Sequence, residues 1–268
     1  MNLLIHSLTE FSPLLLKAFE VAEARAIVEV GSESGGFTAQ VLDWLAGRKG
    51  HLTTIDPMPD DRVRSFATKW PGCHTLLLER TPAALRGLPP ADVYLLDGDH
   101  NYWTVSEELK EIQQSRTSDS TLVVLHDVGW PCGRRDCYYS PQSLPASAVH
   151  PHTHDRGVVL GNPATIDGGF RGEGSFAWAL HEGGPRNGVL TAVEDFMAAN
   201  PGYELIVVPA VFGLGILIPM NHPQHDALHA IFAPYDRNPL LERLENNRLR
   251  NYLRVIELQD QIAGRSRL

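Results

Sequence analysis

The sequence predicts an α/β protein with a seven-stranded, mostly parallel, doubly wound sheet, a long insertion after the fifth strand and a C-terminal helix. Short apolar runs alternate with segments of helical periodicity through the first half of the chain. The alternation stops near Gly129 and returns near Val189, and a long amphipathic segment closes the chain. The length of 268 residues suits one large domain with insertions.

The expected strands are short apolar runs bounded by turns or polar residues. Parallel strands covered on both faces read as continuous apolar runs, because neither face meets water. The seven runs are 26–30, 52–55, 74–78, 93–96, 122–125, 205–208 and 213–218. A short connection joins the last two, which indicates an antiparallel pair. Helices are expected at 14–23, 38–45, 62–70, 82–85, 104–114 and 189–200.

The domain prediction is one catalytic domain over residues 1–236 and a C-terminal amphipathic helix over residues 237–268. Within the catalytic domain, residues 129–186 are rich in Gly, Pro, His and aromatic residues and lack periodicity, which is typical of a lid or a binding loop. The C-terminal helix has apolar residues at helical spacing. It either packs on its own domain or forms a homodimer contact.

The overall composition argues against two classes of partner. A net charge of −9 disfavours a nucleic-acid partner, since phosphate binding needs local positive charge. The apolar stretches are too short to span a membrane, and no signal peptide is recognisable, so the expected location is the cytoplasm. The three cysteines have no disulfide-framework spacing, which suits a reducing compartment.

An acidic, glycine-rich turn, residues 29–38, follows the first expected strand. Its glycines let the backbone approach a ligand, as in nucleotide-binding turns, but the GxGxxG spacing is missing. Glu29 and Glu33 would repel a pyrophosphate and suit a ligand that carries an ammonium and a sulfonium. Asp56 ends the second strand, where a carboxylate can accept hydrogen bonds from both ribose hydroxyls. The alternative is a generic α/β turn.

Over residues 26–128 and the closing strands, the sequence resembles the class I, Rossmann-like methyltransferases. The resemblance implies that S-adenosylmethionine is the cofactor and that the domain over residues 1–236 is a methyltransferase domain. Arg80 departs from the family, which often has an acidic or small residue before a hydroxyl in the loop that borders the adenine. The cofactor-binding residues implied are Glu29, Gly31, Ser32, Gly35, Phe37, Thr38, Asp56, Arg80, Thr81 and Asp97.

Polar residues also follow the fourth and fifth strands. Asp97 comes after one, and His126 and Asp127 end the other, so the three should meet at the carboxyl edge of the sheet. Such donors suit Mg²⁺ or another divalent cation, which lowers the pKa of a bound hydroxyl. His100 is the expected general base, because histidine titrates near physiological pH. Alternatively, Asp97 contacts the cofactor's amino group without a metal, His126 is a local hydrogen-bonding group, and His100 is a polar residue at a helix N-terminus.

The segment 95–102 is similar to metal-dependent O-methyltransferases that act on sugars and other natural products. The resemblance implies an acid after strand four, two consecutive metal ligands after strand five, and a base near the first acid. Asp97, Asp127 and His100 match in type and place. His126 stands where that subgroup usually has an acid or an amide.

The insertion opens with residues suited to recognising an acceptor molecule by charge and stacking. The predicted acceptor-binding residues are Trp130, Arg134, Arg135, Tyr138 and Tyr139. A surface loop with structural aromatic residues is the alternative.

The leading functional hypothesis is O-methylation of a hydroxyl on a small molecule, a sugar or a natural product, assisted by a divalent cation. One alternative is metal-free transfer to nitrogen or oxygen with His100 as the base. A second is an NAD-dependent dehydrogenase, which the missing GxGxxG disfavours. A third is a non-catalytic S-adenosylmethionine-binding protein that works through its C-terminal helix.

Overall fold

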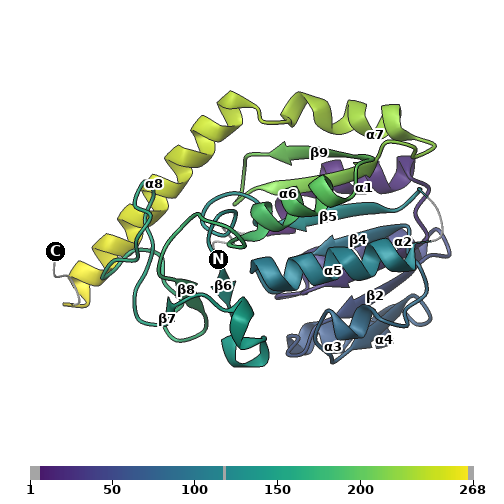
Figure 1. The fold of residues 1–268 in the computed structure, drawn as a ribbon. Helices are drawn as coiled ribbons and strands as arrows, with labels where there is room; N and C mark the ends of the chain where they lie inside the picture. The colour runs from purple at the N-terminus through teal and green to yellow at the C-terminus, as the bar shows by residue number, and fades with distance from the viewer. Residues whose placement is uncertain (1–6, 117–118, 265–268) are drawn as a thin grey trace.

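The computed structural model describes residues 7–116 and 119–264 (Figure 1). The ends of the two predicted domains, 1–6 and 265–268, lie outside the described residues. The central sheet has seven strands in the order β3-β2-β1-β4-β5-β10-β9. Strands β1 to β5 are parallel, and β10 is antiparallel to both β5 and β9. The predicted fold class is confirmed.

The strands follow the apolar runs closely. Every residue of β4, β5 and β10 is buried, which explains why these segments read as unbroken apolar runs. The sheet strands are β1 (Ala26–Val30), β2 (His51–Ile55), β3 (His74–Leu77), β4 (Val93–Leu96), β5 (Leu122–His126), β9 (Tyr203–Val208) and β10 (Leu214–Pro219).

Helices cover both faces of the sheet and give it two apolar cores. Side chains alternate along each strand, so Ile27 faces one core and Val28 the other. On the first face lie η1 (Leu8–Phe11), α1 (Ser12–Val21), α2 (Gly36–Ala46), α3 (Asp61–Arg64), α4 (Phe66–Lys69) and α7 (His225–Phe232). On the second lie η2 (Ala83–Leu85), α5 (Tyr102–Ser115) and α6 (Val189–Ala199). The eight-residue α7 was not predicted, because it is short and flanked by histidines and prolines.

The insertion is held together by hydrogen bonds more than by regular structure. Its small sheet has the order β6-β8-β7, with β6 (Cys137–Tyr138), β7 (His152–Thr153) and β8 (Ala177–Ala179). Short 3₁₀ turns lie at Pro141–Ser143 and Ala146–Ala148. The buried Asp136 carboxylate accepts from the backbone N–H groups of Tyr102 and Gly188, both at 2.7 Å. These bonds join both ends of the insertion to the start of α5, although the segment has no sequence periodicity.

The C-terminal helix α8 (Pro239–Ile262) occupies the residues whose spacing predicted it, after the short turn η5 (Ala233–Tyr235). In Figure 1 it runs along the outside of the insertion, away from the sheet. The Arg171 guanidinium pairs with both carboxylate oxygens of Asp260, with Nη1 2.8 Å from Oδ2. The opposite face leaves apolar side chains exposed at Leu240, Leu244, Val255, Leu258 and Ile262. The homodimer through this helix stays a prediction.

Within residues 7–116 and 119–264, none of the helices combines the length and the apolar character that a membrane span requires.

Candidate active site

The turns after β1 and β4 touch at the carboxyl edge of the sheet. These two strands are neighbours, but the chain leaves them toward opposite edges, and ligands bind in the crevice at such a switch point. Gly31 has φ +80°, and a Cβ placed there would lie 2.2 Å from the carbonyl oxygen of Asp97. Only glycine fits this position, so the turn predicted to approach a ligand also packs directly on the loop after β4.

A cavity of about 770 Å³ opens at this edge, between the strand loops and the insertion. Five of the ten predicted cofactor-binding residues line it, namely Gly31, Asp56, Arg80, Thr81 and Asp97. The Asp56 carboxylate accepts from the N–H and the hydroxyl of Ser32, at 3.0 and 2.7 Å, and from the N–H of Met58 at 2.9 Å. These bonds fix Asp56 at the end of β2, where the ribose was expected.

The other five predicted cofactor-binding residues do not line the cavity. Glu29 is buried, and its carboxylate accepts from the hydroxyls of Thr38 and Thr54, both at 3.0 Å. Burial raises the pKa of Glu29 to about 8, against the lowering effect of the two threonine bonds. Ser32, Gly35, Phe37 and Thr38 also lie outside the cavity lining. The acidic residue of this turn that lines the cavity is Glu33.

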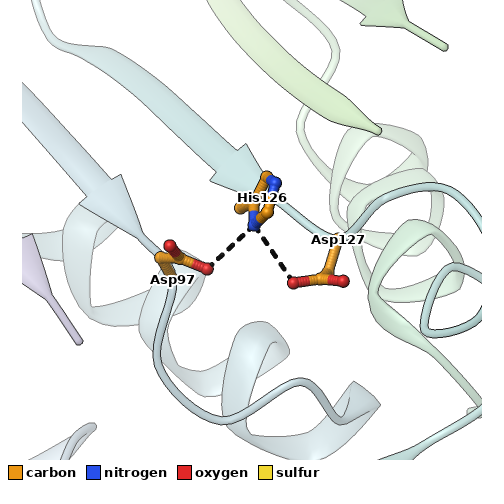
Figure 2. A group of neighbouring side chains, drawn as sticks. All are labelled: Asp97, His126 and Asp127. Carbon is orange, nitrogen blue, oxygen red and sulfur yellow. Dashed lines mark hydrogen bonds and ion pairs between the residues drawn. The ribbon is translucent and has the colours of Figure 1, made fainter. Parts of the chain in front are cut away.

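Asp97, His126 and Asp127 converge as their positions after β4 and β5 predicted (Figure 2). His126 Nδ1 lies 3.1 Å from a carboxylate oxygen of each aspartate. Its Nε2–H donates to the carbonyl oxygen of Val211 at 2.8 Å. Because a carbonyl oxygen only accepts, this bond fixes the hydrogen on Nε2 and turns Nδ1 toward the two carboxylates.

Asp97, His126 and Asp127 together could hold a metal ion. One donor atom from each residue lies within 4.8 Å of the others. Metal-binding histidines typically donate the N–H of the nitrogen that does not bind the metal to a carbonyl or a carboxylate, and Nε2 of His126 makes such a bond. Without a cation, protonation of His126 at Nδ1 would place a positive charge 3.1 Å from a carboxylate oxygen of Asp97 and of Asp127. Burial lowers the pKa of His126, but the carboxylates of Asp97 and Asp127 outweigh it and raise the pKa well above its usual value.

His100 lies beside this group, in the loop between β4 and α5. Its Nδ1 is 3.5 Å from Asp127 Oδ2, and the side chain lines the cavity. The loop ends at the cap of α5, where the Asn101 side chain accepts from the N–H of Thr104 at 2.9 Å. Asp99, which was not among the predicted site residues, also lines the cavity and accepts from the N–H of Tyr139 at 3.3 Å.

Of the predicted acceptor-binding residues, the structure places Tyr139 in the cavity lining. Arg135 is fully buried and donates to the carbonyl oxygens of Ala179 and Pro163, at 2.6 and 2.7 Å. Arg134 forms a bidentate pair with a glutamate of α6, and the buried Tyr138 hydroxyl donates to Asp136. Trp130 is not in the cavity lining, and the centre of its ring lies 6.3 Å from that of Phe170 and 6.4 Å from that of Phe212. Four of the five residues therefore hold the insertion in shape.

Five aromatic residues that were not predicted to face a ligand line the cavity, namely Trp103, Phe170, Phe176, Trp178 and Phe212. Trp103 lies in α5, the next three lie in the insertion, and Phe212 precedes β10. No periodicity marks the three in the insertion, and its aromatic composition was their only signal in the sequence.

Part of the chain, which includes the strand ends that border the cavity, matches a known family model. Residues 28–128 match the family model described as a methyltransferase domain. Among curated proteins, none matches the chain. An O-methyltransferase from Bacillus cereus, solved with SAH, is 12% identical, with 81% of this chain and 84% of that chain covered and a TM-score of 0.46. The O-methyltransferase TomG from Streptomyces achromogenes, involved in tomaymycin synthesis and solved with SAM, is 15% identical, with 78% and 80% covered and a TM-score of 0.44. Both similarities are too distant to transfer a substrate.

Proposed function

Since the chain is a class I, S-adenosylmethionine-dependent methyltransferase, we propose that it methylates a hydroxyl oxygen of a small molecule with the help of a divalent cation. The observation that carries the proposal is the convergence of Asp97, His126 and Asp127 beside His100 in one cavity. Two carboxylates and an imidazole nitrogen suit Mg²⁺ or Mn²⁺, with acceptor oxygens and water completing the coordination.

Each residue at the site has a separate role in the proposed reaction. When S-adenosylmethionine is bound, its C–S bond breaks as the new O–CH₃ bond forms, and the sulfur keeps the electron pair. A cation held by Asp97, His126 and Asp127 would lower the pKa of the acceptor hydroxyl. His100 would take the hydroxyl proton, with Asp127 3.5 Å from its Nδ1 to stabilise the resulting imidazolium. Asp56 would accept from the ribose hydroxyls.

The test measures metal binding separately from turnover. We expect Mn²⁺ titration of the full chain, followed by electron paramagnetic resonance, to find one site. Asp127→Asn should lower the Mn²⁺ affinity of that site at least about 10-fold. Loss of a group that only hydrogen-bonds to a metal ligand already lowers metal affinity by about that factor. The matched control is Asp236→Asn, a half-buried aspartate near α8, which should keep the Mn²⁺ affinity of the wild type. S-adenosylhomocysteine binding by both variants checks that they are folded.

One observation favours a second candidate, metal-free methyl transfer with His100 as the base. A protonated His126 would itself neutralise Asp97 and Asp127, because Nδ1 lies 3.1 Å from both. Wild-type protein that binds no Mn²⁺ and releases S-adenosylhomocysteine at full rate in a chelator would select this candidate and reject the metal.

A further inference from the structure

We propose that the acceptor is a planar aromatic molecule carrying the reacting hydroxyl, selected by Phe170, Phe176, Trp178 and Phe212. These four side chains are called the aromatic wall. The proposal rests on the proposed function and narrows its substrate from small molecules in general to hydroxylated aromatic rings. The aromatic hydroxyl oxygen gains the methyl group, the C–S bond breaks with its electron pair on sulfur, and the hydroxyl proton passes to His100.

The aromatic wall is a continuous set of ring contacts. Phe170 stacks on Phe212, with centroids 5.9 Å apart and planes 7° apart. Phe176 meets Phe170 and Trp178 edge to face, at 5.9 and 5.0 Å. Tyr139 extends the set, with its ring 6.0 Å from that of Phe176. Such rings prefer stacked and edge-on partners, so a further aromatic ring is the ligand that they fit.

The wall borders the reactive group at both ends. At one end, Phe212 follows Val211, whose carbonyl oxygen accepts from His126. At the other end, the ring of Tyr139 lies 6.0 Å from that of His100. A ring seated against the wall therefore has the proposed base and the carboxylate group next to it, where its hydroxyl must react.

On the aromatic wall itself, the low hydrogen-bonding capacity favours an aromatic ring over a sugar. The wall side chains carry one polar hydrogen, on Trp178 Nε1, and it already donates to the carbonyl oxygen of Phe170 at 2.9 Å. A sugar would bring several hydroxyls to this surface, and each one buried without a partner costs about 1–3 kcal/mol. Among the cavity-lining residues of the described chain, Arg80 is the only lysine or arginine, and it donates to Ser140. The lining therefore offers little positive charge to bind the phosphate of a sugar phosphate.

Helix α8 holds the wall in position from outside. The N–H of Phe212 donates to the Glu245 carboxylate at 3.0 Å, and the Arg248 guanidinium carbon lies 5.0 Å from the centre of its ring. The ring of Tyr252 meets Phe170 edge to face at 5.6 Å. A wall fixed before the acceptor arrives loses little conformational entropy on binding.

The experiment compares flat aromatic and sugar probes on the full chain loaded with S-adenosylhomocysteine. The probes are 2-naphthol, 2,3-dihydroxynaphthalene and methyl glucoside, and isothermal titration calorimetry gives each Kd. We expect at least one naphthalene probe to bind, and we expect titration with the glucoside to release no measurable heat of binding. Phe176→Leu should weaken naphthalene binding about 10-fold and leave the affinity for S-adenosylhomocysteine unchanged. The matched control is Phe196→Leu on α6, whose ring packs on Tyr203 and does not line the cavity.

Three outcomes would overturn the inference: neither naphthalene binds, the glucoside binds more tightly, or Phe176→Leu and the wild type have the same Kd. Turnover with S-adenosylmethionine separates this inference from the proposed function. Naphthalene binding without release of S-adenosylhomocysteine would reject O-methylation of that ring and keep the aromatic site. Release of S-adenosylhomocysteine with the glucoside alone would keep the methyltransferase function and reject the aromatic acceptor.

Discussion

Replacing Glu29 by glutamine should change how the stability of the protein depends on pH. Glu29 lies under the glycine turn, buried, with two threonine hydroxyls as hydrogen-bond donors. Burial raises its pKa from 4.5 to about 8, so the folded protein binds a proton here that the unfolded chain releases at lower pH. Glutamine has nearly the same shape and no proton to lose.

The size of the effect follows from the two pKa values. Because the folded pKa is the higher one, the contribution of Glu29 to stability is fully present below pH 4.5 and is lost as the pH rises toward 8. At about 1.4 kcal/mol for each tenfold change in proton affinity, the full loss is about 5 kcal/mol. The wild type should therefore lose up to about 5 kcal/mol more than Glu29→Gln between these pH values.

Urea unfolding at pH 5, 6, 7 and 8 measures this difference. The free energies of unfolding of wild type and Glu29→Gln should be close at pH 5 and should diverge steadily, with the variant the more stable at pH 8. Glu242→Gln, an exposed glutamate on α8, is the matched control and should follow the wild type. Parallel pH dependences of wild type and Glu29→Gln would refute the reasoning, because they would mean that Glu29 stays ionised in the folded protein.

Four further substitutions test the contacts around the cavity, each by thermal unfolding and by binding of S-adenosylhomocysteine. Arg135→Met should cost about 3–5 kcal/mol, since it leaves buried carbonyls without donors, whereas Arg134→Ala breaks a half-exposed pair and should cost less than about 1 kcal/mol; equal costs would contradict the burial argument. Asp260→Asn should cost about 1–3 kcal/mol and speed limited proteolysis of the insertion, because one oxygen of a bidentate pair is lost; unchanged proteolysis would show that α8 does not hold it. Gly31→Ala should abolish S-adenosylhomocysteine binding, since its Cβ would lie 2.2 Å from a backbone oxygen; wild-type affinity would mean that the two turns can separate.

The sheet and its reactive edge were largely predictable from local sequence. The bounds of β1 and β4 match the predicted runs, because strands buried on both faces leave a continuous apolar signal. The meeting of Asp97 with Asp127 followed from the general rule that the ends of neighbouring parallel strands share an edge.

In the insertion, the sequence did not predict which side chains face the cavity. Residue type indicated that Arg135 and Tyr138 were suited to an acceptor, but it did not indicate which way they face. The burial of Arg135 depends on the carbonyl oxygens of Pro163 and Ala179, which are 28 and 44 positions away. Tyr138 is buried in β6, which pairs with the distant strand β8. Glu29 shows a related limit. Its acidity suggested a cationic ligand, but its charge depends on burial, which the turn sequence alone does not reveal.

The insertion and the catalytic edge are connected by hydrogen bonds as well as by proximity. The N–H of Cys137, in β6, donates to the carbonyl oxygen of His100 at 3.0 Å, and the N–H of Tyr139 donates to Asp99 at 3.3 Å. The loop that carries the proposed base is thus held on one side by the cap of α5 and on the other by the insertion. A change in the insertion that alters acceptor choice should therefore also move His100. Acceptor specificity and catalytic rate should accordingly change together when this insertion is exchanged, even though the wall and the base lie on different segments of the chain.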